Sequence, residues 1–285
     1  MGLPMAGHFH AAGHVVTVSD PGQARLQLAR SQGLQVAGDA GAAMARADII
    51  VSSLPNDAAL RQVAAQVAQS ARPGAIYIDT STVSQQASAE VAQVLAAAGV
   101  FYLRTTVSGN NRMAEAAQLT VMASGPRAAY DTALPLLKLL GPHQFYLGEA
   151  EEARLMKLVV NLMIAQTSAM LAEALTLGRK GGLNWQDMWQ VLGASAVASP
   201  IVKAKAVQLA VRDFTPTFTV EQMIKDLDLI LDAGRAVHAP LAQTALTQQL
   251  MYAAMAHGDG QDDYAAIIKT VERSAGLGTA LEKVP

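Results

Sequence analysis

Residues 48–84 decide the fold class, and they read DIIVSSLPNDAALRQVAAQVAQSARPGAIYIDTSTVS. Two short apolar runs, Asp48–Leu54 and Ala75–Asp79, are bounded by Pro, Gly, Asp and Ser, as is typical of buried parallel strands. Between them, Asp57–Ser70 carries apolar residues at helical spacing. A strand, a helix and a second strand in this order predict a right-handed crossover unit within a parallel sheet.

The same alternation extends in both directions from this stretch, up to about residue 148. Further strands are expected at His14–Val18, Phe101–Val107, Leu119–Ser124 and Gln144–Leu147. Further helices are expected at Pro21–Gln32, Ser84–Ala98 and Arg127–Leu140. Strands that alternate with helices predict an α/β domain with a doubly wound parallel sheet over residues 1–148.

Residues 149–285 show helical periodicity without strand-like alternation. Helices are expected at 151–180, 185–192, 200–211, 220–236, 240–257 and 263–274. Gly181–Gly182 ends the long first helix, and Asn184 suits the cap of the next one. We therefore predict an all-α second domain, joined to the first by a long helix, with a cleft between the two.

Composition excludes several classes of protein. The 285 residues are 51% hydrophobic and 15% charged, which favours well-buried cores over disorder. A net charge of −2 without a run of Lys or Arg argues against nucleic-acid and membrane-surface partners. The apolar run 158–177 contains Asn, Gln, Thr, Ser and Glu, so we interpret it as a buried helix and not as a membrane span.

The absence of cysteine excludes disulfides and a thiolate nucleophile, and it is compatible with a reducing cytoplasm. No secretory signal is readable at the N-terminus. The six histidines are scattered without the spacing of a metal motif, so no metal site is expected.

The N-terminal residues have the pattern of a dinucleotide-binding domain with its beginning removed. Such a domain starts with a strand, a G-x-G-x-x-G turn and a helix that faces the pyrophosphate. Met1–Ala6 looks like the helix start, which makes Gly2 the third glycine and leaves the first strand and two glycines without a counterpart. Asp20, after the next strand, suits contact with the ribose hydroxyls of NAD, with a turn before Pro21–Gly22 as the alternative.

Two later segments also occupy positions where an open α/β sheet binds its ligand. Leu54–Pro55 follows one buried strand, and Ser81–Thr82 follows the next strand along the chain. Ligands bind outside the carboxyl ends of parallel strands, so both segments are candidates for cofactor contacts. Ordinary loop structure and a helix cap are the alternative interpretations.

Short motifs follow one another in order over nearly the whole chain, and they are Met1-Gly2-x-Pro4-Met5-Ala6, Gly13-His14-x-Val16-x-Val18-x-Asp20, Leu54-Pro55, Asp79-x-Ser81-Thr82, Val107-Ser108-Gly109, Lys157-x-x-x-Asn161, Lys225-Asp226-Leu227 and Asp263-x-Ala265-Ala266. This ordered set resembles the 3-hydroxyisobutyrate dehydrogenase family, which is 6-phosphogluconate dehydrogenase-like. The resemblance implies a Rossmann domain, an all-helical domain, and interconversion of a β-hydroxyacid and its semialdehyde or keto form. It implies NAD as cofactor, with NADP as the alternative.

The resemblance assigns the proton transfer to Lys157, with Asn161 orienting the substrate or the lysine. The residues agree with this, because a spacing of four places both side chains on one face of the long helix. Desolvation in an apolar cleft lowers the pKa of a lysine, which suits it to take a hydroxyl proton. The alternative is a lysine that reaches to water beside an asparagine hydrogen-bonded in the core.

The remaining implied roles concern the substrate and the support of the site. Ser108, Gly109 and the neighbouring Asn110 would hold a substrate carboxylate, Lys225 would line the cofactor side, and Asp263 would support the closed site. The chain departs from the family pattern at residues 104–106, Arg-Thr-Thr in place of Asp-Ala-Pro. The change adds a cation and hydroxyl groups near the expected substrate wall, so we expect a substrate different from 3-hydroxyisobutyrate, one that is larger or more polar.

Two rival functions remain open. An imine reductase of the same architecture is disfavoured by Lys157, because the resemblance implies Asp or Tyr at that position in those enzymes. A catalytically silent, truncated homologue that acts as a binding or dimer protein would explain the incomplete glycine motif. The broad apolar helical half predicts a homodimer or homotetramer.

Overall fold

The computed structural model describes residues 1–278, and the chain forms two compact units. The first unit is Met1–Lys157 and the second begins at Leu158. Helix α8, Glu152–Lys180, crosses the division, which therefore lies later than the expected boundary at 148/149. The start of α8 belongs to the first unit because its side chains are buried against the sheet.

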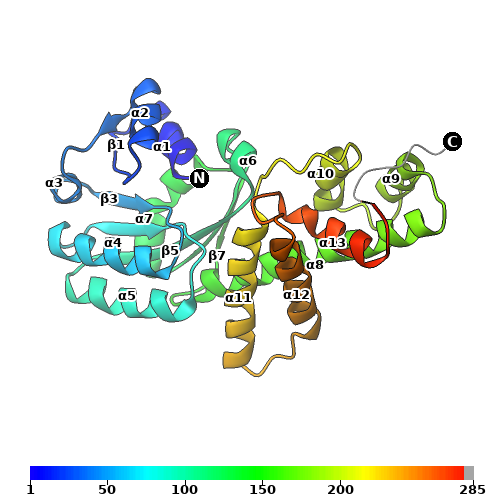
Figure 1. Ribbon diagram of the computed structural model, residues 1–285. Helices are drawn as coiled ribbons and strands as arrows, with labels where there is room; N and C mark the ends of the chain where they lie inside the picture. The colour runs from blue at the N-terminus through cyan, green and yellow to red at the C-terminus, as the bar shows by residue number, and fades with distance from the viewer. Residues whose placement is uncertain (279–285) are drawn as a thin grey trace. The chain divides into compact units, whose positions relative to one another are not determined.

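A five-stranded sheet organises the first unit (Figure 1). Its strands, in spatial order, are β3 (Ile49–Ser52), β4 (Ile76–Asp79), β5 (Phe101–Ser108), β6 (Thr120–Ser124) and β7 (His143–Tyr146). The strands β1 (Thr17–Val18) and β2 (Gln35–Val36) form a separate parallel pair. The α/β fold and its parallel pairs are confirmed, and β2 is an addition that the sequence did not predict.

One pair in this sheet, β5 with β6, is antiparallel. Residues 109–119 connect the two strands and contain only the short helix α6, Asn111–Glu115. A parallel crossover needs a dozen or more residues, usually with a full helix. The chain therefore turns back at the end of β5, which the simple alternation of strands and helices does not reveal.

Helices cover both faces of the sheet, and side chains on the strands alternate between the two layers. Helices α1 (Gly2–Ala11) and α7 (Arg127–Lys138) lie on one face, and α4 (Asp57–Ser70) and α5 (Gln85–Ala97) lie on the other. Helix α2 (Gln23–Ser31) packs with the β1–β2 pair, and α3 (Ala40–Met44) contacts α4. Ile76, Ile78 and Leu103 pack with α1 and α7, whereas Tyr77 and Tyr102 pack with α4 and α5. Successive side chains of a strand point to opposite faces, and both faces are covered by helices, so these strands are apolar along their whole length.

The second unit is helical throughout the part of it that the structure describes, as predicted. Beyond α8 it contains α9 (Trp185–Ala194), α10 (Pro200–Leu209), α11 (Val220–Ala236), α12 (Ala242–Ala256), a 3₁₀ turn (Tyr264–Ala266) and α13 (Ile267–Ser274). Asn184 caps α9 as expected, because its side chain accepts from the N–H groups of Gln186 and Asp187.

Helix α8 provides one wall of the second unit's core. Leu171 and Leu175 are buried there with Trp185 and Trp189, whose rings meet edge to face. By length and composition α8 is also apolar enough to cross a membrane, a property that it shares with the core helices of soluble proteins. One side of α8 is buried within the unit, in agreement with the prediction of a core helix, while other hydrophobic side chains on the helix are exposed.

Candidate functional site

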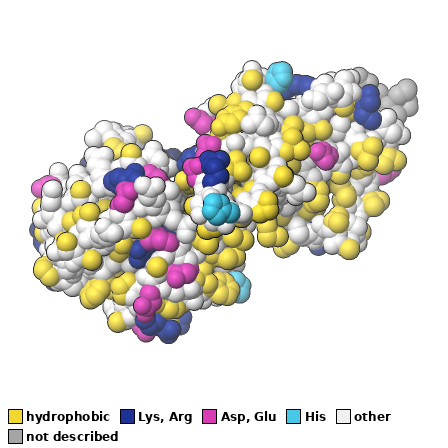
Figure 2. All heavy atoms as spheres, turned by 90° about the horizontal axis from the view of Figure 1, so that it is seen from below, with side chains coloured by type: hydrophobic (Ala, Val, Ile, Leu, Met, Phe, Trp, Pro, Cys, Tyr) yellow, Lys and Arg dark blue, Asp and Glu magenta, His cyan; other side chains and the backbone are white. Residues whose placement is uncertain are grey.

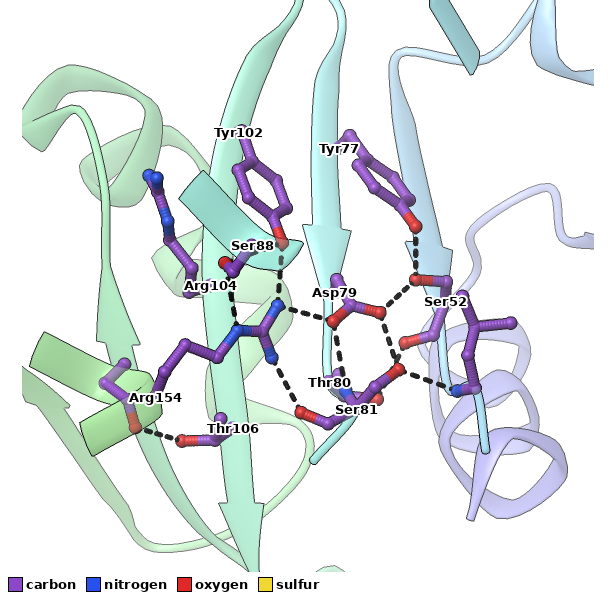
Figure 3. A network of polar contacts seen from close by, with 12 residues as sticks. Ser52, Tyr77, Asp79, Thr80, Ser81, Ser88, Tyr102, Arg104, Thr106 and Arg154 are labelled. Atoms are coloured by element: carbon purple, nitrogen blue, oxygen red, sulfur yellow. Dashed lines mark hydrogen bonds and ion pairs between the residues drawn. The ribbon is translucent and has the colours of Figure 1, made fainter. Parts of the chain in front are cut away.

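The carboxyl ends of β3 and β4 meet in a buried polar network (Figure 3). Ser52 and Asp79 are paired in register at these ends, and the Ser52 hydroxyl donates to Asp79 Oδ1 at 2.5 Å. Ser52 Oγ also lies 2.7 Å from the hydroxyl of Tyr77. A carboxylate can be buried at this position because neighbouring donors satisfy its oxygens.

Arg154, in the first turn of α8, neutralises the Asp79 carboxylate (Figure 3). Both side chains are fully buried, and Arg154 Nη2 lies 2.5 Å from Asp79 Oδ2. Burial alone would lower the pKa of Arg154, but Tyr102 and Asp79 together raise this pKa above its ordinary value. Arg154 therefore stays charged, and each partner depends on the other for its burial.

The network also fixes the two loops that the sequence singled out beside these strands. Ser81 Oγ donates to Asp79 Oδ1 at 2.7 Å and accepts from the Leu54 N–H at 2.7 Å. Thr80 Oγ1 donates to the Ser52 carbonyl at 2.7 Å. The structure thus joins Leu54–Pro55 to the loop that contains Ser81 and Thr82.

The first residues place Gly2 beside the same sheet edge. Gly2 begins α1, and a Cβ at this position would lie 3.6 Å from Ser53 Cβ, an ordinary contact, so space alone does not require glycine. No side chain caps the start of α1. Asp20 is exposed after β1, and its Oδ1 accepts from the Gly22 N–H at 2.7 Å, which is a turn contact.

The segment Ser108–Asn110 links β5 to α6. Gly109 has a φ of +139°, and a Cβ there would come within 2.6 Å of Leu119 Cδ2, so glycine is required. Asn110 Oδ1 accepts from the Met113 N–H at 3.0 Å and caps α6. The Asn110 side chain thus already has a local structural role.

Arg104 and its neighbours, which we expected near the substrate wall, are buried inside the fold. Arg104 is buried and donates to Glu151 Oε1 at 2.5 Å, and Thr106 Oγ1 donates to the Ala153 carbonyl at 3.0 Å. Thr105 is buried as well. These two contacts attach the start of α8 to β5. A buried cation is stable only with a nearby anion, and Glu151 supplies that anion for Arg104.

Lys157 lies one helical turn after Arg154, and it is half-buried, not turned fully into solvent. It is the last residue of the first unit, so it belongs to the same compact body as the network. Asn161 follows one turn later on the same face of α8, as the spacing predicted.

In the second unit, Asp226 brings together two of the predicted residues. Asn161 Nδ2 donates to Asp226 Oδ2 at 2.5 Å, and Lys225 Nζ lies 2.8 Å from Asp226 Oδ1. A carboxylate only accepts hydrogen bonds, so it fixes which way the Asn161 amide is turned. Asp226 itself was not singled out from the sequence, although its position beside Lys225 was a usable signal.

Asp263 lies elsewhere in the second unit, in a buried ion pair with Lys205 at 2.6 Å. Burial lowers the pKa of Lys205, and Asp263 opposes that shift. Asp263 Oδ2 also accepts from the Thr217 N–H and hydroxyl. These contacts hold the segment before α11, so the structure shows Asp263 as a support within the helical unit.

Among residues 1–278 there is no group of three or more His, Cys, Asp or Glu side chains placed to hold a metal ion. The other residues that sequence reasoning missed are Arg154 and Glu151. Both are charged residues at the start of an apolar helix, and their buried partners come from strands far away in the chain.

Comparison with known proteins agrees with the architecture. Residues 1–148 match the model of the NAD binding domain of 6-phosphogluconate dehydrogenase. Residues 152–271 match that of the NAD-binding domain of NADP-dependent 3-hydroxyisobutyrate dehydrogenase. The 2-(hydroxymethyl)glutarate dehydrogenase of Eubacterium barkeri is 32% identical over 284 residues, covering 98% of this chain and 94% of that protein.

Two solved structures have the same fold over nearly their whole length. The 3-hydroxyisobutyrate dehydrogenase of Mycobacterium tuberculosis, with L-serine, is 29% identical with a TM-score of 0.86, covering 95% of each chain. The 3-hydroxyisobutyrate dehydrogenase of Salmonella typhimurium is 26% identical with a TM-score of 0.86, covering 94% of this chain and 95% of that one. The chain belongs to the 3-hydroxyisobutyrate dehydrogenase family of NAD(P)-binding oxidoreductases, which are 6-phosphogluconate dehydrogenase-like.

Proposed function

We propose that the protein interconverts a small β-hydroxyacid and its semialdehyde or keto form, with Lys157 as the general acid and base. The observation that carries the proposal is the position of Lys157. It is half-buried on α8, one turn beyond the arginine that joins this helix to the loops at the ends of β3 and β4.

The residues of the first unit fit an NAD(P) cofactor. The uncapped start of α1 leaves backbone N–H groups for a pyrophosphate, which a helix N-terminus also attracts through its dipole. The exposed carboxylate of Asp20 suits a pair of ribose hydroxyls and therefore NAD in preference to NADP. Leu54, Pro55, Ser81 and Thr82 would contact the cofactor nearer the sheet, with Lys225 from the helical unit.

The bound nicotinamide supplies or accepts the hydride. Lys157 Nζ takes the hydroxyl proton during oxidation and returns it during reduction, for which partial burial is favourable because desolvation lowers the pKa of a lysine. Asn161, with its amide held by Asp226, offers its carbonyl oxygen to the substrate or to the lysine. Ser108 and the Gly109 backbone bind the carboxylate.

The substrate class is a carboxylate that bears a hydroxymethyl or similar β-hydroxyl group. The names of the relatives supply the first compounds to test: 3-hydroxyisobutyrate, 2-(hydroxymethyl)glutarate and L-serine. Because Arg104 is paired with Glu151 inside the fold, it gives no reason to expect a larger or more polar substrate. Formation of NADH or NADPH should be followed at 340 nm with each compound.

The test of the mechanism is Lys157→Met, with Lys203→Met as the control, since Lys203 is exposed on α10. Loss of a general base lowers turnover by about 10²–10⁴-fold. We expect that loss in Lys157→Met, with NADH still bound as judged by fluorescence, and native activity in Lys203→Met. Native turnover in Lys157→Met would refute the assignment.

We also propose that the enzyme is a cytoplasmic homodimer or homotetramer, with α8 contributing to the contact between copies. Hydrophobic side chains lie over much of the helical unit on the face in Figure 2. On α8, Met163, Met170 and Leu177 are exposed and seven residues apart, the repeat of a helix that packs along another helix. Light scattering should show an oligomer that Met170→Glu dissociates, and a monomeric native protein would contradict this proposal.

A further inference from the structure

We propose that Arg154 is a positioning residue, which holds the loop of residues 79–82 and the helical turn of Lys157 in one fixed relation. The inference rests on the proposed function, because that function assigns the cofactor to the loop and the proton transfer to the lysine. The fold alone does not require a buried ion pair at this place, and the proposed role of Arg154 explains why the pair is there.

The guanidinium group makes four hydrogen bonds, all inside the first unit (Figure 3). Nη2 donates to Asp79 Oδ2 at 2.5 Å and to the Tyr102 hydroxyl at 2.7 Å. Nη1 donates to the Ser81 carbonyl at 2.6 Å, and Nε to Ser88 Oγ at 3.2 Å. These partners come from β4, β5, α5 and the loop itself.

Arg154 does more than form an ion pair with Asp79, because it also binds the Ser81 carbonyl. It attaches the side chain to the loop backbone, while Asp79 attaches it to the Ser81 hydroxyl and so to Leu54. A planar guanidinium directs its donors in fixed directions, which a lysine ammonium cannot reproduce. One side chain thereby sets the conformation of both candidate cofactor loops.

Arg154 also sets the place of Lys157, because the two residues are three apart on α8. A helix rises 1.5 Å per residue, so their Cα atoms are separated by about 4.5 Å along the axis. Residues three apart also lie on neighbouring parts of one face. A shift of the guanidinium therefore moves the lysine relative to the loop.

Burial of the pair is not explained by stability. Replacing a buried ion pair with apolar side chains is often neutral or stabilising, so such a pair is weak evidence for a role in stability. Nearby, the Arg104–Glu151 pair attaches the same part of the chain to β5 through two hydrogen bonds, neither of which involves the loop of residues 79–82. This second pair is a natural control for the attachment of α8 by itself.

The experiment compares Arg154→Lys with Arg104→Lys. We expect both to lower the melting temperature, but only Arg154→Lys to weaken NADH binding, by about tenfold or more, the scale of one lost hydrogen bond to a charged group. Arg154→Lys should also lower kcat more than it raises KM for the hydroxyacid and should shift the alkaline midpoint of the pH profile. The conservative Tyr102→Phe, which keeps the ion pair, should show the same pattern more weakly.

Amide hydrogen exchange tests the role of Arg154 without relying on the proposed reaction. Hydrogen exchange at the amides of Leu54 and Ser81 should accelerate in Arg154→Lys and stay native in Arg104→Lys. If the native protein oxidises no hydroxyacid, the proposed function fails, while NADH binding and exchange still decide the role of Arg154. Equal effects of the two lysine variants on binding and exchange would overturn the inference.

Discussion

Replacing Asp226 with Asn tests how the helical unit holds its site residues. The change keeps the shape of the side chain and removes its charge. Asp226 is buried, accepts from Asn161 Nδ2 and lies 2.8 Å from Lys225 Nζ. The variant can still offer one carbonyl oxygen to Asn161, but its amide group cannot pair with Lys225.

The structure sets the size of the expected effect. A hydrogen bond to a charged group contributes about 1.5–3 kcal/mol. Lys225 keeps about a third of its side chain in solvent, which favours the lower end of this range. For larger domains 1 kcal/mol corresponds to roughly 2–4 °C, so at the lower end of the range Asp226→Asn should melt about 3–6 °C below the native protein.

Thermal unfolding followed by circular dichroism measures this difference, and Asp228→Asn is the matched control. Asp228 is on the same helix and exposed, and its carboxylate accepts from Gln248 and Tyr252, for which the carbonyl oxygen of an Asn can substitute. We expect the control to melt with the native protein, and we expect Asp226→Asn to lower hydroxyacid turnover because an uncharged acceptor holds the Asn161 amide more weakly. Identical melting curves for both variants, with native turnover, would refute the reasoning.

Three further changes have directions that the structure predicts. Ala117 has a φ of +51°, which costs an L-residue about 1–2 kcal/mol, so Ala117→Gly should raise the midpoint of urea unfolding; an unchanged or lower midpoint would contradict this. Glu272 is fully buried between two arginines, so Glu272→Gln should destabilise the helical unit by up to about 3–5 kcal/mol in urea unfolding, and native stability would show that the arginines find other partners. Burial raises the pKa values of Tyr77, Tyr102 and Tyr264, so these hydroxyls stay protonated in the fold while they ionise in the unfolded chain from about pH 10; stability should therefore fall above that pH, and a flat profile from pH 9 to 11 would exclude it.

Much of the architecture could be predicted because the spacing of apolar residues along the chain distinguishes strands from helices. Apolar runs bounded by turn residues identified β3, β4 and β5. Helical spacing of apolar residues identified α4 and α5, which lie between these strands in the chain. The change to helices alone after residue 148 identified the second unit. Short elements were missed, because β2 has two residues and α6 has five, too few to establish a period.

The candidate site was predictable only as far as its residues lie in short motifs. Lys157 and Asn161 share a helix face by spacing alone, and Ser81 follows a strand end. Helix geometry and strand order fix such relations before any long-range contact forms.

Tertiary structure alone decided the partners of the buried charges. Arg154 meets Asp79 across 75 positions of sequence, and Asn161 meets Asp226 across 65. The sequence placed Arg104 near the expected substrate wall, and the fold gives it Glu151 as a partner. A charge can be buried only where another part of the chain supplies its counterion, and local sequence does not say which part that is.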